Sequence, residues 1–159
     1  MEKGAILDNT KKYRYELWRK WDLDKPGITF IMLNPSTADH TEDDSTIKKC
    51  IKFSKRWGYG QISVVNLFAY RATKPEELKG VTDPVGRENN QHLQNVIDNS
   101  QVIVAAWGVE GKLHGRNIEV DGMLRSKENV YCLGTTKEGH PMHPLYLSDD
   151  TELILFSKQ

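Results

Sequence analysis

Asparagine side chains follow two apolar segments of this chain, at the kind of position where a binding site can form. Asn34 comes directly after one apolar run and precedes Pro35 and Ser36, and Asn66 ends a second run. A buried amide needs several hydrogen bonds, because it carries both donors and acceptors. The same pairing of donor and acceptor can match the edge of a nucleobase. Either residue alone can simply cap a turn, but the two together predict a shared pocket.

Histidine and arginine side chains add further chemistry near these segments. His140 and His143 lie in a proline-rich stretch, and histidine changes its protonation near neutral pH. Either histidine can instead be structural, bonded within its own loop. Arg71 follows Asn66 closely, and its planar guanidinium suits a phosphate or a carboxylate. A surface ion pair is the alternative for Arg71.

An acidic segment suggests a metal as a rival interpretation. Asp39, Glu42, Asp43 and Asp44 crowd together around His40, and oxygen-rich clusters can hold magnesium or calcium. Their spacing matches no calcium-binding loop, however. Acidic residues are also expected at the start of a helix, where they cap it and complement its dipole. We therefore expect no metal and no cofactor.

Four apolar runs predict the strands that position these residues. They are rich in β-branched residues and do not alternate with polar ones, which is typical of strands covered on both faces. The predicted strands span residues 27–33, 62–67, 102–106 and 130–133. Residues 13–18 alternate aromatic and charged side chains and predict a short edge strand or a flanking hairpin.

Amphipathic segments lie between the predicted strands and predict helices. The apolar stripes span residues 47–57, 85–97 and 113–124. Alternation of strand and helix indicates a parallel sheet with helices on both sides. Ligands bind such sheets beyond the carboxyl ends of the strands. This rule points to the loops that carry Asn34, Asn66, Trp107 and His143.

Composition indicates one ordinary domain over residues 1–159. Formal net charge is zero, from 22 basic and 22 acidic residues, whereas dedicated nucleic-acid binders are usually basic. No apolar run is long enough to span a membrane. Cys50 and Cys132 lack metal-type spacing, so we expect reduced, buried thiols and a cytoplasmic location. The oligomeric state stays open.

Several long motifs resemble a known family over nearly the whole chain. They include the segments at 13–15, 32–39, 43–47, 66–73, 83–84, 106–108 and 139–146. On these motifs the chain resembles an uncharacterised family of small bacterial and phage proteins, a domain of unknown function (number 1643). This resemblance implies no activity.

A more distant resemblance does imply an activity. The order of motifs is similar to the uracil-DNA glycosylase superfamily, which implies a three-layer sandwich with a four-stranded parallel sheet in the order 2-1-3-4. In its mismatch-specific branch an Asn-Pro-Gly motif orients the attacking water, and Leu33-Asn34-Pro35-Ser36 looks like that motif. Asn66 is then the counterpart of the residue that contacts the uracil edge. The Trp-Gly pair at Trp107 is also similar.

The same resemblance gives roles to the last loop. The superfamily places a catalytic histidine and an apolar wedge there, and Leu145 would be the wedge. Residues 140–145 have one residue more than that loop, so either His140 or His143 can be the counterpart. A histidine would stabilise the departing base, and Phe68 or Tyr70 would stack on it.

Three functional hypotheses follow for the predicted pocket. In the first, it binds a nucleobase or nucleotide, with DNA as a further partner, and hydrolyses an N-glycosidic bond. In the second, it captures a nucleotide without turnover. In the third, the acidic segment supports metal-assisted phosphoester hydrolysis. For the first two, the candidate catalytic residues are Asn34, His140 and His143, and the candidate ligand-binding residues are Pro35, Ser36, Asn66, Phe68, Tyr70, Arg71, Trp107, Leu145 and Tyr146.

Overall fold

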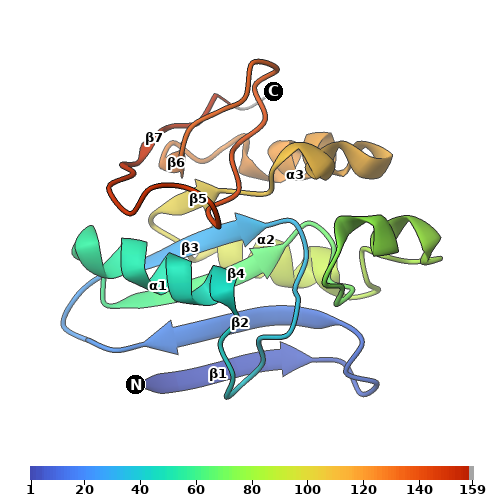
Figure 1. Cartoon of the computed structure of the whole chain (residues 1–159), viewed down its shortest axis with the longest axis horizontal. Coiled ribbons are helices and arrows are strands. Elements are labelled where there is room, and N and C mark those ends of the chain that lie inside the picture. Colours follow the sequence, from blue (N-terminus) through green and yellow to red (C-terminus); the bar gives the residue numbers. More distant parts are fainter. Residues whose placement is uncertain (158–159) are drawn as a thin grey trace.

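One mixed β-sheet runs through the whole molecule (Figure 1). The computed structural model describes residues 1–157, and within these the sheet has seven strands in the order β1-β2-β4-β3-β5-β6-β7. The strands are β1 (Glu2–Leu7), β2 (Arg14–Lys20), β3 (Gly27–Met32), β4 (Gln61–Asn66), β5 (Ile103–Ala105), β6 (Val130–Cys132) and β7 (Ile154–Leu155).

The prediction of a four-stranded parallel, uracil-DNA glycosylase-like sheet is wrong. β3 pairs in parallel with β4 and β5, and β5 with β6. The sheet continues beyond them, however, because β1–β2, β2–β4 and β6–β7 pair antiparallel. The sheet is therefore mixed, and its edges belong to antiparallel strands.

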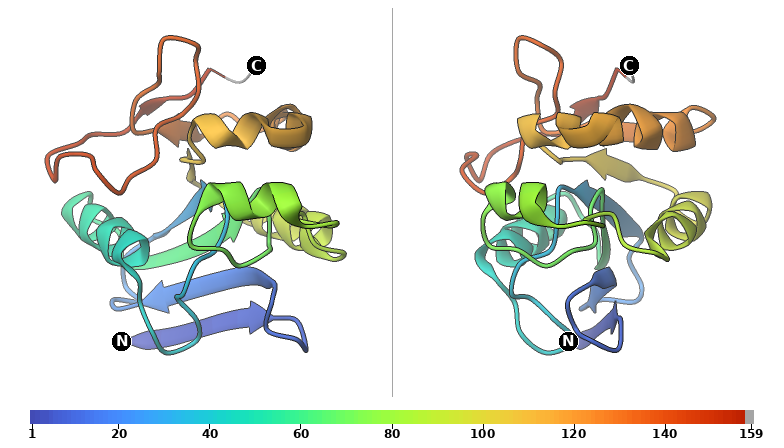
Figure 2. Two further views of the ribbon diagram at one scale, coloured as in Figure 1. Left: turned by 45° about the vertical axis from the view of Figure 1, so that its right-hand side comes forward. Right: turned by 90° about the vertical axis from the view of Figure 1, so that its right-hand side faces the viewer.

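Helices cover both faces of this sheet, and each face has its own core (Figure 2). Successive strand residues point to opposite faces, so Phe30 packs toward α1 while Ile31 packs toward α2 and α3. The helices are α1 (Ser45–Arg56), α2 (Asn89–Asp98) and α3 (Arg116–Leu124), with the 3₁₀ segments η1 (Pro75–Gly80) and η2 (Val109–Gly115).

Helix α1 begins directly after the acidic segment, where the sequence predicts that an acidic residue caps a helix. The Asp44 side chain caps the helix, because its Oδ1 accepts a hydrogen bond from the Ile47 amide at 2.9 Å. Gly58 follows the helix with a φ of +91°, a left-handed conformation that glycine adopts without strain. This cap places the first turn of α1 beside the carboxyl end of β3.

The two cysteines lie in the core. Cys50 and Cys132 are buried free thiols, as expected, and burial raises the pKa of both. Among residues 1–157, no helix has the length and apolar character that crossing a membrane requires.

Candidate active site

A small cavity lies at the carboxyl ends of β3 and β4, where Met32 and Asn66 are paired in register. Its volume is about 30 Å³. Polar side chains from five segments of the chain line it: Arg14, Asn34, Ser36, Asp44, Thr46, Asn66 and His143. The site therefore brings together residues that the sequence predicted and residues that it did not.

Asn66 is the most unusual of these side chains, because it is buried and unsatisfied. Only 1% of the residue is exposed, and within residues 1–157 neither Oδ1 nor Nδ2 has a hydrogen-bond partner. Leaving a buried polar group unpaired costs roughly 1–3 kcal/mol. The backbone here is fixed, since the Asn66 carbonyl accepts a hydrogen bond from Asn89 Nδ2 at 2.9 Å. The backbone of Asn66 is thus fixed, while both polar atoms of its side chain are open to a partner that residues 1–157 do not supply.

Arg14 reaches the same cavity because of a bulge in β2. Ile6 pairs with Glu16 and Leu7 with Arg14, which leaves Tyr15 as the extra residue. A bulge of this kind changes the face to which a side chain points. Tyr15 stacks on His92 of α2 with ring centroids 4.8 Å apart, while Arg14 lines the cavity on the α1 side.

The Arg14 guanidinium is buried without an adequate set of partners. Only 2% of the residue is exposed. Its Nη1 donates to the Ala38 carbonyl at 3.1 Å, while Nε has no partner in the described part of the chain. Burial lowers the pKa of Arg14 to about 10, against the opposing effect of Asp44. Arg14 is therefore a cation at neutral pH, held beside Asn66.

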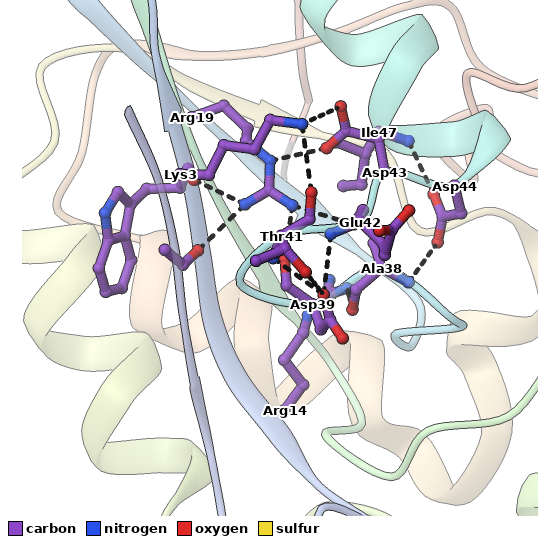
Figure 3. A network of polar contacts seen from close by, with 12 residues as sticks. Lys3, Arg14, Arg19, Ala38, Asp39, Thr41, Glu42, Asp43, Asp44 and Ile47 are labelled. Carbon is purple, nitrogen blue, oxygen red and sulfur yellow. Dashed lines mark hydrogen bonds and ion pairs between the residues drawn. The ribbon is translucent and has the colours of Figure 1, made fainter. Parts of the chain in front are cut away.

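Arg19, on the same strand, shows what a satisfied buried arginine looks like (Figure 3). Its Nε donates to Asp43 Oδ1 at 2.7 Å. Its two Nη atoms donate to backbone carbonyls, those of Gly4, Trp18, Asp39 and Glu42. All five N–H donors of a guanidinium can be satisfied by these five contacts. Arg19 is thus a structural residue, and it fixes the acidic segment before α1.

Three of the four acidic side chains of that segment are held by the fold, those of Asp39, Asp43 and Asp44. Asp39 Oδ1 accepts from the amides of Thr41 and Glu42, and these bonds lower the pKa of Asp39 to about 2. Asp43 pairs with Arg19 and Lys3. Over residues 1–157 no three side chains of metal-binding type lie close together. These contacts use the carboxylates of Asp39 and Asp43 within the fold, so the structure gives no support to metal-assisted hydrolysis by this segment.

The structure places His143, and not His140, at the cavity. His143 Nδ1 accepts a hydrogen bond from the Leu145 amide at 3.2 Å, so the neutral ring carries its proton on Nε2. Burial lowers the pKa of His143, while the charge of Asp44 opposes this effect. His140 lies in the preceding hairpin, 3.6 Å from Glu138. His143 therefore offers the cavity an N–H donor.

Replacing Asp44 by asparagine is expected to lower the pKa of His143 further, because it removes the nearby negative charge. Asparagine caps helices about as well as aspartate, so α1 is retained. The pKa of His143 lies below its usual 6.5 in the folded protein. Its contribution to stability is therefore present above pH 6.5 and is lost as the pH falls toward the folded-state pKa. An NMR titration of the His143 ring measures the shift, and a higher pKa in the variant would contradict the assignment.

Asn34 is fixed at the rim of the cavity. Its Nδ2 donates to the carbonyls of Pro35 and Ala72 at 2.9 and 2.8 Å. Its Oδ1 is therefore the atom that can accept a hydrogen bond from a ligand or a water molecule. Pro35 and Ser36 line the cavity beside it.

Other predicted ligand residues lie elsewhere. Phe68 and Trp107 are buried in the core with α2 and α3, and do not line the cavity. The structure thus places both rings in the core, since aromatic rings next to strand ends fill the core as readily as a pocket, and their predicted roles in stacking and ligand contact stay predictions. Tyr70 packs edge-on against Tyr13. Tyr146 is 93% exposed.

Arg71 and Leu145 make contacts within the chain that differ from the ligand contacts predicted for them. Arg71 donates to the carbonyls of Lys11, Ser36 and Thr37, at 3.1–3.2 Å. Its guanidinium thus ties two loops together instead of standing free for an anion. Leu145 is half-buried, and its amide orients His143.

Sequence reasoning missed Arg14 and Asp44 as residues of the site. Arg14 lies between two tyrosines in an alternating segment, where a charged residue is expected to face solvent. The sequence indicates Asp44 as a helix cap or as part of an acidic cluster, and not as a residue of this pocket. Two features of the sequence could have indicated these residues. Arg14 lies inside an aromatic run, and Asp44 is a helix cap that follows a predicted strand.

Fold and site together define an α/β protein with a mixed sheet and a buried polar cavity at the carboxyl ends of its parallel strands. A family model described as "Protein of unknown function (DUF1643)" matches residues 14–145, and the chain belongs to this family. No curated protein and no solved structure matches the chain. The resemblance to uracil-DNA glycosylases is not confirmed by these comparisons.

Proposed function

We propose that the cavity binds the polar edge of a nucleobase, and the unsatisfied amide of Asn66 is the observation that carries this proposal. A donor and an acceptor lie side by side on this amide, buried and without partners. A flat ring with a neighbouring N–H and C=O satisfies both at once. Such a ligand would remove the cost of the unpaired amide on binding.

The surrounding groups favour an edge that is rich in acceptors. Arg14 Nε and His143 Nε2 are donors, and Asn66 adds a donor and an acceptor. A pyrimidine with two carbonyl groups offers acceptor, donor and acceptor in sequence. Its N–H would bond to Asn66 Oδ1, and its carbonyls would accept from Asn66 Nδ2 and from Arg14 or His143. Either carbonyl of a uracil-like base can take either of these places, because its N–H lies between them. Cytosine offers acceptor, acceptor and donor along the same edge, so it can pair with Asn66 in one orientation alone, and we therefore expect the uracil-like base to bind more tightly.

The segment over the cavity must move for a ring to enter. A volume of about 30 Å³ holds one or two water molecules. His143 is the residue of the last loop that lines the site, and the backbone amide bonds that follow it are local, from Leu145 to His143 Nδ1 and from Leu147 to the Pro144 carbonyl. In contrast, Met142 is held to Gly134. His143 and the residues after it can thus move away from the cavity without loss of these hydrogen bonds to the sheet.

Hydrolysis of an N-glycosidic bond is the reaction that suits these groups. Water would add to the sugar carbon as the bond to the base breaks. The base would leave as an anion and take up the proton that the water releases. Arg14 and His143 would stabilise the negative charge of the leaving base. Asn34 Oδ1 would orient the water.

Capture of a nucleotide without turnover is the second candidate, and the hydrogen bonds of the Asp44 carboxylate favour it. Both carboxylate oxygens of Asp44 accept backbone amide hydrogens, from Ile47 and from Ala38. This carboxylate is therefore a poor general base for a water molecule. Under this alternative the same pocket holds the nucleotide unchanged.

Calorimetric titration with uridine, cytidine and adenosine tests the binding proposal. We expect uridine to bind most tightly, and Asn66→Ala to weaken it about 10- to 100-fold, since one paired base contact is worth roughly 1–3 kcal/mol. Asn129→Ala, at an exposed site away from the cavity, is the matched control. Chromatography after incubation separates release of free uracil from capture. Equal affinity of the wild type and Asn66→Ala would overturn the proposal.

A further inference from the structure

A basic groove lies beside the cavity, on the other side of the loop after β3. Its volume is about 370 Å³. Lys11, Lys12, Tyr70 and Arg71 line it together with Ser36, and Ser36 also lines the cavity. A ligand that extends out of the cavity past Ser36 would therefore enter this groove.

Positive charge is concentrated in this groove although the chain as a whole is neutral. Three cations line it against one carboxylate, that of Glu77, and Glu77 already accepts from the Thr73 amide. The ammonium groups of Lys11 and Lys12 make no ion pair or hydrogen bond to residues 1–157. Both are exposed. They are thus available to an anion.

The turn that carries the two lysines contains an unfavourable backbone conformation. Lys11 has a φ of +63°, a left-handed conformation that is unfavourable for any residue with a side chain. Arg71 fixes this turn, because its Nη1 donates to the Lys11 carbonyl and its amide to the Lys12 carbonyl at 2.8 Å. The nearby Asp8 carboxylate is occupied by Thr10 and the Tyr13 amide. The turn that carries the lysines is therefore attached to the loop that follows Asn66.

We propose that this groove binds the phosphate of the ligand whose base enters the cavity, so that the ligand is a phosphorylated nucleotide unit and not a free base or nucleoside. This inference rests on the proposed function of the cavity. The phosphate ester belongs either to a mononucleotide or to a single strand of nucleic acid. Lysine ammonium groups bind such phosphates as compact charges.

Comparison of uridine with uridine monophosphate tests the inference. We expect the monophosphate to bind the wild type at least 10-fold more tightly than uridine does. Lys11→Gln combined with Lys12→Gln should abolish this difference and leave the affinity for uridine unchanged. Lys25→Gln combined with Lys112→Gln removes the same charge outside the groove and should change neither affinity.

The outcomes separate the inference from the function on which it rests. The proposal that the groove binds phosphate would be overturned if uridine binds tightly and the monophosphate binds no more tightly. It would also be overturned if the higher affinity of the monophosphate survives in Lys11→Gln/Lys12→Gln. Either result would leave the proposed base site intact. Absence of binding by both ligands would overturn both proposals. A single-stranded oligonucleotide with one deoxyuridine distinguishes the sources of phosphate. If a strand is the ligand, it binds more tightly than the monophosphate. The slope of the logarithm of its binding constant against the logarithm of the salt concentration should then be smaller by about 1.4 in Lys11→Gln/Lys12→Gln than in the wild type.

Discussion

Replacing Arg19 by methionine is expected to lower the free energy of unfolding by about 3–5 kcal/mol, the usual range for breaking a buried charged network. Arg19 is fully buried. Its guanidinium satisfies Asp43 and four backbone carbonyls between β1 and the acidic segment. Methionine fills similar volume but supplies no donor, so these acceptors would stay buried and unpaired. Urea denaturation measures the loss.

Arg14→Met is the matched control on the same strand. It removes one hydrogen bond, to the Ala38 carbonyl, and it also removes a buried cation whose Nε has no partner within residues 1–157. We expect a loss of at most about 1 kcal/mol, the contribution of one hydrogen bond. Equal losses in the two variants would show that Arg14 is a structural residue like Arg19, and would weaken the case for the cavity.

The central strands could be found from the sequence, and the prediction of a strand or hairpin at residues 13–18 is confirmed by β2, which pairs with β1. The outermost strands β1 and β7 could not be found. Apolar runs identify β3 and β4 because strands covered on both faces need them. β1 begins with charged residues and is half-exposed, and β7 is two exposed residues. In β2 two arginines are buried, which inverts the expected pattern. Burial of a charge depends on partners distant in the chain, and no local pattern shows them.

The position of the candidate site was more predictable than its composition. Asn34 and Asn66 meet because parallel strands end at the same edge of the sheet. The choice between His140 and His143 depends on a hairpin that turns His140 toward Glu138, and spacing does not reveal that turn. Arg14 joins the site through one extra residue in β2. A one-residue change in strand register moves a side chain to the opposite face, which sequence reasoning could not foresee.

Replacing Asn66 by leucine is expected to raise the free energy of unfolding by about 1–3 kcal/mol, the cost of a buried unpaired polar group, and to abolish ligand binding. Leucine has nearly the same shape, and Met32, Ile47 and Val64 would surround it with apolar contacts. A substitution that stabilises the fold while it removes function identifies a residue retained for its activity. Thermal or urea denaturation, combined with titration of uridine, measures both effects.

Asn89→Leu should have the opposite effect on stability, although Asn89 is buried just as completely. Its Nδ2 donates to the carbonyls of Asn66 and Leu67 at 2.9 and 3.1 Å, so leucine would leave the Asn66 carbonyl without that donor. The Leu67 carbonyl keeps its bond from Arg116 Nε, which limits the expected loss to about 1–2 kcal/mol. A gain in stability for Asn66→Leu and a loss for Asn89→Leu would show that Asn89 serves the fold and that Asn66 serves a ligand. If Asn66→Leu also destabilised the protein, its amide would have a structural partner, and the main support for a base-binding site would be lost.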